Sequence, residues 1–350
     1  MKKNLMISLA DNYGGVASAC QNLSLINKRI TPIYLKKNKI FLIKEVIKTK
    51  KTLILMHFEP IFFVPILKIL KKKYICVIHT DLAKYFENCN FIKKITIRIY
   101  LKIIKNDLII FTSKESELNS KKKFNLPNTL TIYNFTPKIE SVAHIPKGVI
   151  SLGIVSRLDK NKNIDFAIKI FSLLKGKNII LNIFGDGPER INLEKYAKKL
   201  NISEKIIFHG YESKKSNIYS KINATLSFSS LEGFAVSLVE SINQNIPAFH
   251  TDCSSGPREI FAPDSNPTIK TKSFELYKSG MLVKPLNRKS NYELSISAED
   301  KEYLHYLSIF IDKIKSNYFD FSNENLNLKK STINIQWNKV LDEMDGGFKP

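Results

Sequence analysis

Residues 231–240 read LEGFAVSLVE, in which a glutamate, a glycine and an aromatic residue precede a helix that carries a second glutamate. The helix is expected over residues 235–243, so Glu232 lies just ahead of it and Glu240 lies on it. An ionised carboxylate only accepts hydrogen bonds, and at such a helix it suits the two hydroxyls of a ribose. The same spacing also fits an ordinary helix with one capping acid and one solvated acid. Only the flanking sequence can distinguish this structural role from a ligand-binding one.

The sequence on both sides alternates short apolar runs with longer amphipathic ones, which predicts βα units and parallel sheets. Strands are expected at 5–9, 53–56, 74–78, 108–111 and 129–133, and then at 150–155, 179–184, 206–209, 224–228 and 247–250. Helices are expected at 16–26, 60–72, 91–105, 114–123, 164–174, 189–200, 214–222 and 235–243, with a helical tail over 298–343.

A length of 350 residues suits two domains. A polar, proline-containing stretch, FTPKIESVAHIPKG, follows Asn134 and separates the two βα series. We predict an α/β fold of two facing Rossmann-like, doubly wound domains, residues 1–145 and 146–325, with a central ligand cleft at the carboxyl ends of both sheets. Residues 326–350 are predicted as a helical tail that could pack back on the N-terminal domain, with Trp337 as a packing residue.

The composition is that of a globular protein, with 43% hydrophobic and 25% charged residues. The four cysteines form no C-x-x-C pair, so neither a metal site nor a disulfide framework is predicted. The apolar run in MKKNLMISLA is too short for a signal peptide, and residues 60–70 are too short to cross a bilayer, which takes roughly 20 residues. A cytoplasmic location is therefore expected.

The positive charge is concentrated in one part of the chain. Residues 1–150 hold 27 Lys and Arg against 9 Asp and Glu, a net +18, whereas residues 151–350 hold 28 against 23, a net +5. An AT-rich genome would enrich lysine everywhere and does not explain this asymmetry. A basic half favours a polyanionic partner, either nucleic acid or an anionic membrane surface.

Four further segments of the second half carry chemistry at predicted strand ends. Arg157 and Lys162 lie in SRLDKNK and suit a diphosphate. The Arg157 guanidinium offers paired N–H donors, and the Lys162 ammonium offers a compact positive charge. Gly185 lies in the turn FGDGPE, and Tyr211 in HGY follows a strand where backbone groups could contact a nucleobase. The small-residue turn SSGPREI opens a short helix whose backbone N–H groups can hold an anion.

These five motifs, in this order between about residues 150 and 283, resemble the donor domain of family 4 glycosyltransferases of the GT-B fold. The resemblance implies that Arg157 and Lys162 hold the donor diphosphate, that Glu232 meets the donor sugar and that Glu240 holds the ribose. Gly233 and Phe234 would approach the donor through their backbone. Three positions depart from the family pattern, because Ser156 and Ala235 replace glycines and Ser237 replaces a proline, which leaves the pocket shape and the donor open.

The first half resembles the family less strongly. Gly14 and Gly15, in DNYGGVAS, are similar to the glycine loop that faces the diphosphate, and His79, in VIHTD, to the active-site histidine that contacts the donor sugar. A plain turn and a structural histidine are the alternatives. Candidates for contact with the acceptor, at predicted strand ends, are Asp11, His57, Glu59 and Asp81.

The resemblance implies a retaining glycosyltransferase of the hexosyltransferase class. Its donor would be a nucleotide-sugar, most readily a UDP-hexose or UDP-N-acetylhexosamine, and its acceptor a saccharide or a lipid-linked glycan in lipopolysaccharide or capsule synthesis. Arg157 and Lys162 would stabilise the leaving diphosphate. No D-x-D motif stands in a setting suited to a metal, so neither a metal nor another cofactor is expected.

The basic half includes a predicted helix, 91–105, on which Lys94, Arg98, Lys102 and Lys105 recur at helical spacing beside several isoleucines. Such a helix suits the interface of an anionic membrane, so we expect peripheral association with the inner face of the plasma membrane. A solvated helix face is the alternative. Two other functions stay open, a nucleotide-sugar epimerase of the same architecture and a basic nucleic-acid-binding protein, although no nucleic-acid-binding motif accompanies the lysines.

Overall fold

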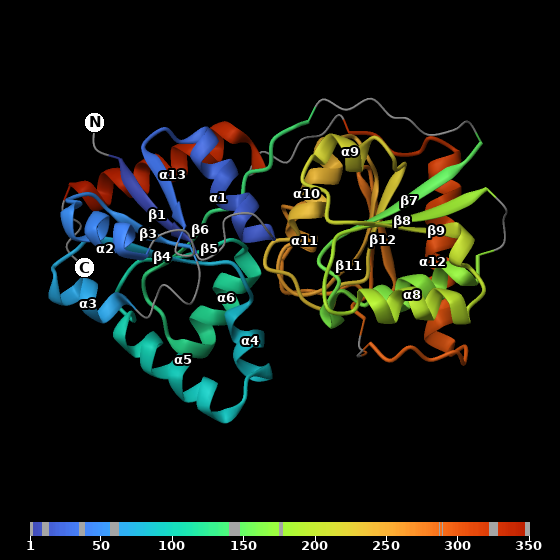
Figure 1. The fold of residues 1–350 in the computed structure, drawn as a ribbon, viewed down its shortest axis with the longest axis horizontal. Coiled ribbons are helices and arrows are strands. Elements are labelled where there is room, and N and C mark those ends of the chain that lie inside the picture. The colour runs from blue at the N-terminus through green and yellow to red at the C-terminus, as the bar shows by residue number, and fades with distance from the viewer. Residues whose placement is uncertain are drawn as a thin grey trace. The chain divides into compact units, whose positions relative to one another are not determined.

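The computed structural model describes residues 3–8, 14–34, 39–56, 63–139, 148–174, 178–286, 288, 290–321 and 328–346. The chain forms two compact units, which are described separately below. Unit 1 comprises Met1–Thr136 and Asn325–Pro350, and unit 2 comprises Pro137–Glu324 (Figure 1). The division falls at Thr136 rather than at the expected residue 145, and the C-terminal segment belongs to unit 1.

Unit 1 is built on a six-stranded parallel sheet of order β2-β1-β3-β4-β5-β6. The strands are β1 Asn4–Ser8, β2 Ile30–Tyr34, β3 Leu53–Leu55, β4 Tyr74–Ile78, β5 Ile109–Phe111 and β6 Thr129–Thr131. The helices are α1 Gly15–Ile26, α2 Lys39–Lys48, α3 Val64–Ile69, α4 Leu82–Asn88, α5 Phe91–Ile103, α6 Lys114–Phe124 and α13 Lys330–Asp345.

The four central strands of unit 1, β1, β3, β4 and β5, are buried on both faces, and their side chains alternate between two hydrophobic clusters. Leu53 and Leu55 of β3 pack in the cluster that includes α3 and α5, whereas Ile54 packs in the cluster that includes α1 and α13. This alternation follows from the pleat of a strand, in which successive side chains point to opposite faces. Trp337 of α13, with 4% of its surface exposed, lies in the second cluster.

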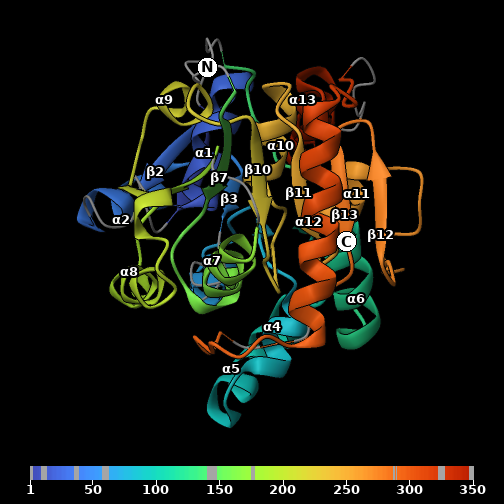
Figure 2. The same cartoon turned by 90° about the vertical axis from the view of Figure 1, so that its right-hand side faces the viewer.

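Unit 2 is built on a seven-stranded sheet of order β12-β13-β11-β10-β7-β8-β9, in which only the β12–β13 pair is antiparallel. The strands are β7 Ile150–Val155, β8 Ile179–Phe184, β9 Ile206–Gly210, β10 Ala224–Ser227, β11 Ala248–Thr251, β12 Phe274–Tyr277 and β13 Gly280–Val283. The α-helices are α7 Ile164–Ser172, α8 Arg190–Lys199, α9 Lys215–Tyr219, α10 Val236–Asn243, α11 Pro257–Phe261 and α12 Ala298–Lys315. The long helix α12 packs against α7 and β13, as Figure 2 shows.

The α/β class and the two Rossmann-like parallel sheets are therefore confirmed. Five of the described strands and α-helices were not expected from the sequence, namely β2, α2 and α4 in unit 1 and the β12–β13 hairpin in unit 2. The expected helix over residues 60–72 is described only as α3, which ends at Ile69, because Leu70 and Lys71 leave the helical conformation.

Candidate functional site

Lys162 reaches the site because a short 3₁₀ helix, Lys160–Lys162, is held against the loop that follows β10. The backbone N–H of Ser230 donates to the Asn161 carbonyl at 2.9 Å, and the Asn163 amide donates to the Phe228 carbonyl at 3.0 Å. Asn163 adopts the left-handed conformation, with φ of 46°, which asparagine tolerates better than most residues. The turn therefore ends in a geometry that directs Lys162 toward the loop.

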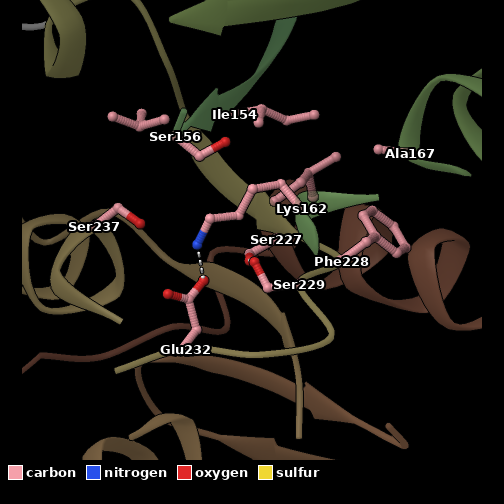
Figure 3. Close-up of a pocket in the computed structure, with 11 residues that line it drawn as sticks. Ile154, Ser156, Lys162, Ala167, Ser227, Phe228, Ser229, Glu232 and Ser237 are labelled. Carbon is pink, nitrogen blue, oxygen red and sulfur yellow. Dashed lines mark hydrogen bonds and ion pairs between the residues drawn. The ribbon is translucent and has the colours of Figure 1, made fainter. Parts of the chain in front are cut away.

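Lys162 and Glu232 form an ion pair in the pocket, with 2.7 Å between Nζ and Oε1 (Figure 3). Their side chains are only 19% and 13% exposed. Although burial alone would raise the pKa of Glu232, the charge of Lys162 and its hydrogen bond lower it, and Glu232 in turn raises the pKa of Lys162. Both groups are thus charged at neutral pH. The other side chains that line this pocket are Ile154, Val155, Ser156, Ala167, Leu226, Ser227, Phe228, Ser229 and Ser237.

Arg157 differs from Lys162 in having an exposed side chain. Within the described part of the chain, its guanidinium makes no ion pair and no hydrogen bond. Its position is nevertheless fixed, because the backbone N–H of Leu158 donates to the Asp186 carbonyl at 3.0 Å and that of Ser156 to the Phe184 carbonyl at 3.1 Å. An unpaired guanidinium on an anchored strand end is available to an anion.

Glu240 is buried within α10, with 3% of its surface exposed. Its Oε2 accepts a hydrogen bond from Lys215 Nζ at 3.0 Å and another from the Tyr219 hydroxyl at 2.9 Å. Among the described residues nothing hydrogen-bonds to Oε1, which leaves acceptor capacity for a ligand hydroxyl. Lys215 and Tyr219 were not identified from the sequence, although their spacing of four residues puts both on one face of a helix.

The loop that carries Glu232 is joined to the turn SSGP. Leu231 forms an isolated parallel bridge with Ser254, and the Glu232 N–H donates to the Ser254 carbonyl at 3.2 Å. A Cβ on Gly256 would lie 2.7 Å from the backbone of Phe234, so only glycine allows the two segments this close approach. The Phe234 side chain is buried, and the contact of its backbone with a donor stays a prediction.

Two predicted positions have structural explanations of their own. Gly185 has φ of 132°, and a Cβ there would lie 1.8 Å from the Ser156 carbonyl oxygen, so glycine is required by packing whether or not it contacts a donor. Ala235, where the family pattern has glycine, is left-handed with φ of 55° immediately before α10. A Cβ in this conformation costs about 1 kcal/mol, so the departure is strained but tolerated.

His250, near the end of β11, is a site residue that the sequence did not reveal. It is 2% exposed, and its Nδ1 lies 2.7 Å from the Thr251 carbonyl oxygen, a contact that fits a neutral ring with Nδ1–H as the donor. Burial lowers its pKa against the opposing effect of the nearby Glu232 carboxylate. His250 therefore adds an uncharged polar group close to the Lys162–Glu232 pair.

In unit 1, Gly14 and Gly15 are exposed at the start of α1. Gly14 has φ of 96°, and no atom of the described residues lies within 4 Å of a Cβ built on it. His79 follows β4 directly and is half-buried. Both positions agree with the sequence expectation, and their contact with a donor stays a prediction.

The expected acceptor residues fare differently. Asp81 is wholly buried, caps α4 by accepting from the Lys84 N–H at 3.1 Å and accepts from the Asn119 amide at 3.2 Å. The structure thus gives Asp81 a capping role, and its contact with an acceptor stays a prediction. Asp11, His57 and Glu59 lie outside the described residues.

The described residues contain no group of three or more His, Cys, Asp or Glu side chains that could hold a metal ion. All four cysteines are free thiols. In the same described ranges, no helix has both the length and the hydropathy that crossing a membrane requires.

Comparison with known proteins identifies the region that holds this site. Residues 135–296 match the sequence model of the family described as glycosyl transferases group 1. This segment, which is less than half of the chain, is similar to that family. The match confirms the resemblance to glycosyltransferases. The group 1 segment, residues 135–296, contains Arg157, Lys162, Glu232 and Glu240, whose roles stay predictions.

Two curated relatives of the group 1 segment act in bacterial glycan synthesis according to their names. The lipopolysaccharide 1,6-galactosyltransferase of Escherichia coli K12 is 32% identical over 114 residues, 31% of this chain and 32% of that enzyme. The N-acetylgalactosamine-N,N'-diacetylbacillosaminyl-diphospho-undecaprenol 4-alpha-N-acetylgalactosaminyltransferase of Campylobacter jejuni is 31% identical over 169 residues, 46% of this chain and 45% of that enzyme. The chain thus spans less than half the length of these relatives.

The fold extends beyond the group 1 segment. The crystal structure of HepE from Anabaena in complex with UDP and glucose matches with a TM-score of 0.74, covering 98% of this chain and 100% of that chain at 13% identity. At this identity the likeness shows the fold alone, which is the two-domain GT-B type.

Proposed function

We propose that the protein is a retaining glycosyltransferase that transfers a sugar from a UDP-sugar to a bacterial saccharide or lipid-linked acceptor. The observation that carries this proposal is the grouping on one unit of an unpaired cation, Arg157, a charge-compensated pair, Lys162–Glu232, and a buried carboxylate, Glu240, with an oxygen left to accept. These are the groups that a diphosphate, a reacting sugar and a ribose require.

Each of these groups has a distinct task in the proposed reaction. The bond between the anomeric carbon and the diphosphate breaks, the acceptor oxygen bonds to the same face of that carbon, and the acceptor's proton passes to the departing phosphate oxygen. Arg157 and Lys162 stabilise the charge that develops on the diphosphate. Glu232 alone would repel this anion, and Lys162 removes that repulsion by neutralising the carboxylate at 2.7 Å.

We also propose that the reaction needs no divalent metal ion, because Arg157 and Lys162 would supply the positive charge that a metal ion otherwise gives to a departing diphosphate. Activity that survives chelation by EDTA supports this part of the proposal. Retention is tested separately, by the anomeric configuration of the first product seen by NMR.

The acceptor class is proposed from two observations. The curated relatives include a lipopolysaccharide galactosyltransferase and an enzyme whose name gives a diphospho-undecaprenol acceptor. The first 150 residues carry a net +18, which attracts an anionic membrane surface. Peripheral association with the inner face of the plasma membrane, through the basic helix α5, is therefore part of the proposal.

The donor site is tested by thermal unfolding with UDP, GDP and ADP in the presence of EDTA. UDP at about 100 times its dissociation constant stabilises a one-site protein by about 2.7 kcal/mol, which moves the melting temperature by several degrees. The shift should disappear in Glu240→Ala and persist in Glu275→Gln, which weakens another carboxylate pair of unit 2, with Arg258 at 2.8 Å. A well-folded protein that responds to none of these nucleotides overturns the assignment.

A further inference from the structure

The solvent-facing side of α5 is apolar. Ile97 and Leu101 of this helix are buried against unit 1, with 1% and 4% of their surface exposed. Ile92, Ile95 and Ile99 lie on the opposite side, because helical geometry places them about half a turn from the buried pair. These three, here called the isoleucine ridge, are 75%, 42% and 53% exposed.

The cations of α5 flank this ridge rather than forming it. The Lys94 ammonium lies over the Phe86 ring at 5.8 Å from its centroid and the Arg98 guanidinium at 5.2 Å, so both lie toward α4. Lys93 lies over Tyr85 at 5.0 Å. A helix that only faces water would carry its charges on the side opposite the core, whereas this one carries isoleucines there.

Helix α3 extends the same type of surface. Lys68 of α3 donates a hydrogen bond to the Ile103 carbonyl at 2.7 Å, which joins α3 to the C-terminal end of α5. Ile66 and Ile69 of α3 are 54% and 80% exposed. Residues 63–73 and 91–105 together contain nine Lys and Arg and no Asp or Glu.

The charge of this surface decides what covers it. A second copy of the chain would bring nine like charges against nine, which opposes self-association. A nucleic acid would match the charge but would leave the exposed isoleucines in water. An anionic bilayer satisfies both features, since its headgroups meet the lysines and its acyl chains receive the apolar side chains.

We propose that α5 lies in the interface of an anionic membrane with the isoleucine ridge inserted among the acyl chains, and that α3 joins this contact. The inference rests on the proposed membrane location and deepens it, from charge attraction at a distance to apolar insertion by named residues. It also places the unit expected to bind the acceptor on the bilayer, which selects an acceptor anchored in the same lipid.

Binding of the full chain to vesicles tests the insertion. Ile92→Ser/Ile95→Ser/Ile99→Ser should weaken binding to vesicles containing phosphatidylglycerol by about 100-fold, from the loss of three inserted side chains. The matched control is Ile191→Ser/Ile207→Ser/Ile335→Ser, whose isoleucines are 65%, 44% and 66% exposed elsewhere, and it should bind like the parent protein. Equal binding of both variants overturns insertion.

A fluorescent probe distinguishes insertion from electrostatic adsorption. Ile92→Trp should shift its emission to the blue on phosphatidylglycerol vesicles and be quenched by lipids brominated on the acyl chain, whereas Ile191→Trp should show neither effect. The native Trp337 is buried and contributes a constant signal. An Ile92→Trp protein that binds vesicles with unchanged emission disproves insertion. Insertion is also disproved if the serine triple variant binds vesicles like the parent protein but has lost the parent's binding to duplex DNA.

The UDP-induced thermal shift separates this inference from the proposed function. It should be unchanged in the serine triple variant, because the ridge lies outside the unit that holds the donor site. If UDP does not shift the melting temperature of the parent protein but the protein binds vesicles, the glycosyltransferase proposal is overturned and the proposed membrane contact is still supported.

Discussion

At the scale of single residues, the two cations that follow β7 differ in what holds them. Lys162 is paired with Glu232, so its removal would leave a poorly exposed carboxylate without a partner and would destabilise the fold. Arg157 has no such partner among the described residues and is exposed. Arg157 is therefore the position where a contribution to donor binding can be measured apart from stability.

We expect Arg157→Gln to lower the affinity for UDP by about 10- to 100-fold, the range for the loss of a charge-assisted hydrogen bond. The free energy of unfolding should change by less than about 0.5 kcal/mol, because an exposed side chain without contacts is replaced. Isothermal titration calorimetry and urea unfolding measure the two quantities.

Lys160→Gln is the matched control for this change, since Lys160 is an exposed cation three positions along the same loop. It should leave UDP affinity within about threefold of the parent value, because an exposed charge that does not contact the diphosphate acts on it only through screening solvent. If both variants weaken UDP equally, the guanidinium does not contact the diphosphate and acts only through the general field.

The sequence identified residues that carry chemistry in a motif but not the residues that hold them. Glu232 and Glu240 could be placed relative to α10 because they are only eight positions apart, so the helix between them determines their relative positions. The partners of Glu240 could not, since Lys215 and Tyr219 come from another element and reach it only after the sheet has formed. The same holds for His250, which lies near Glu232. Asp81 shows the converse, because a strand-end carboxylate can cap the next helix as easily as bind a ligand.

At the scale of elements, the expected strands include the continuous apolar runs at the centre of each sheet and the edge strands β6 and β9. The other two edges were not predicted. Strand β2 contains Pro32 and lies at the edge of its sheet, where the missing N–H is tolerated, so its sequence does not look like a central strand. The antiparallel β12–β13 hairpin lies at one edge of the sheet of unit 2. The alternation of strands and helices that predicted the other strands gives no signal for a hairpin.

Helix α13 shows how a terminal element contributes to a unit far from it in sequence. Trp337 packs with Ile26 of α1 and Ile54 of β3, and the Asn27 amide donates to the Asn338 side-chain oxygen at 3.0 Å. The helical tail and the packing role of this tryptophan were expected from composition. Its exact neighbours were not, because a periodic apolar pattern does not say which sheet face it covers.

We expect Trp337→Ala to destabilise unit 1 by about 3–5 kcal/mol, the cost of an emptied aromatic site in a core. The unfolding of unit 2 should be unaffected, so two transitions should separate in urea when followed by circular dichroism. Ile335→Ala, on the same helix but 66% exposed, should change the unfolding free energy by less than about 1 kcal/mol. A single transition that moves as a whole would show instead that the two units unfold together.

At the scale of the whole molecule, the charge is large and unequally distributed. The chain carries +23, of which +18 belongs to residues 1–150. Like charges at this density repel one another in the folded state more than in the expanded chain, so unit 1 is destabilised by its own field. The ion pairs that oppose this effect in unit 1 are mostly exposed, such as Arg29–Asp342 at 2.8 Å, and contribute little.

Salt should therefore stabilise unit 1. Raising sodium chloride to ~0.5 M shortens the Debye length to roughly 4 Å and screens the repulsion. We expect the free energy of unfolding of unit 1 to rise by about 1 kcal/mol, which raises the melting temperature by about 2–4 °C. Trp337 is the chain's single tryptophan and lies in the core of unit 1, so its fluorescence follows this unit alone. Lys105→Gln/Lys121→Gln/Lys122→Gln should raise the midpoint in low salt and reduce the gain on adding salt, because the variant starts with less repulsion. A melting temperature that falls with salt would mean that the ion pairs of unit 1 stabilise it more than its net charge destabilises it. The positive charge would then be compensated within the free protein and less available to an anionic partner.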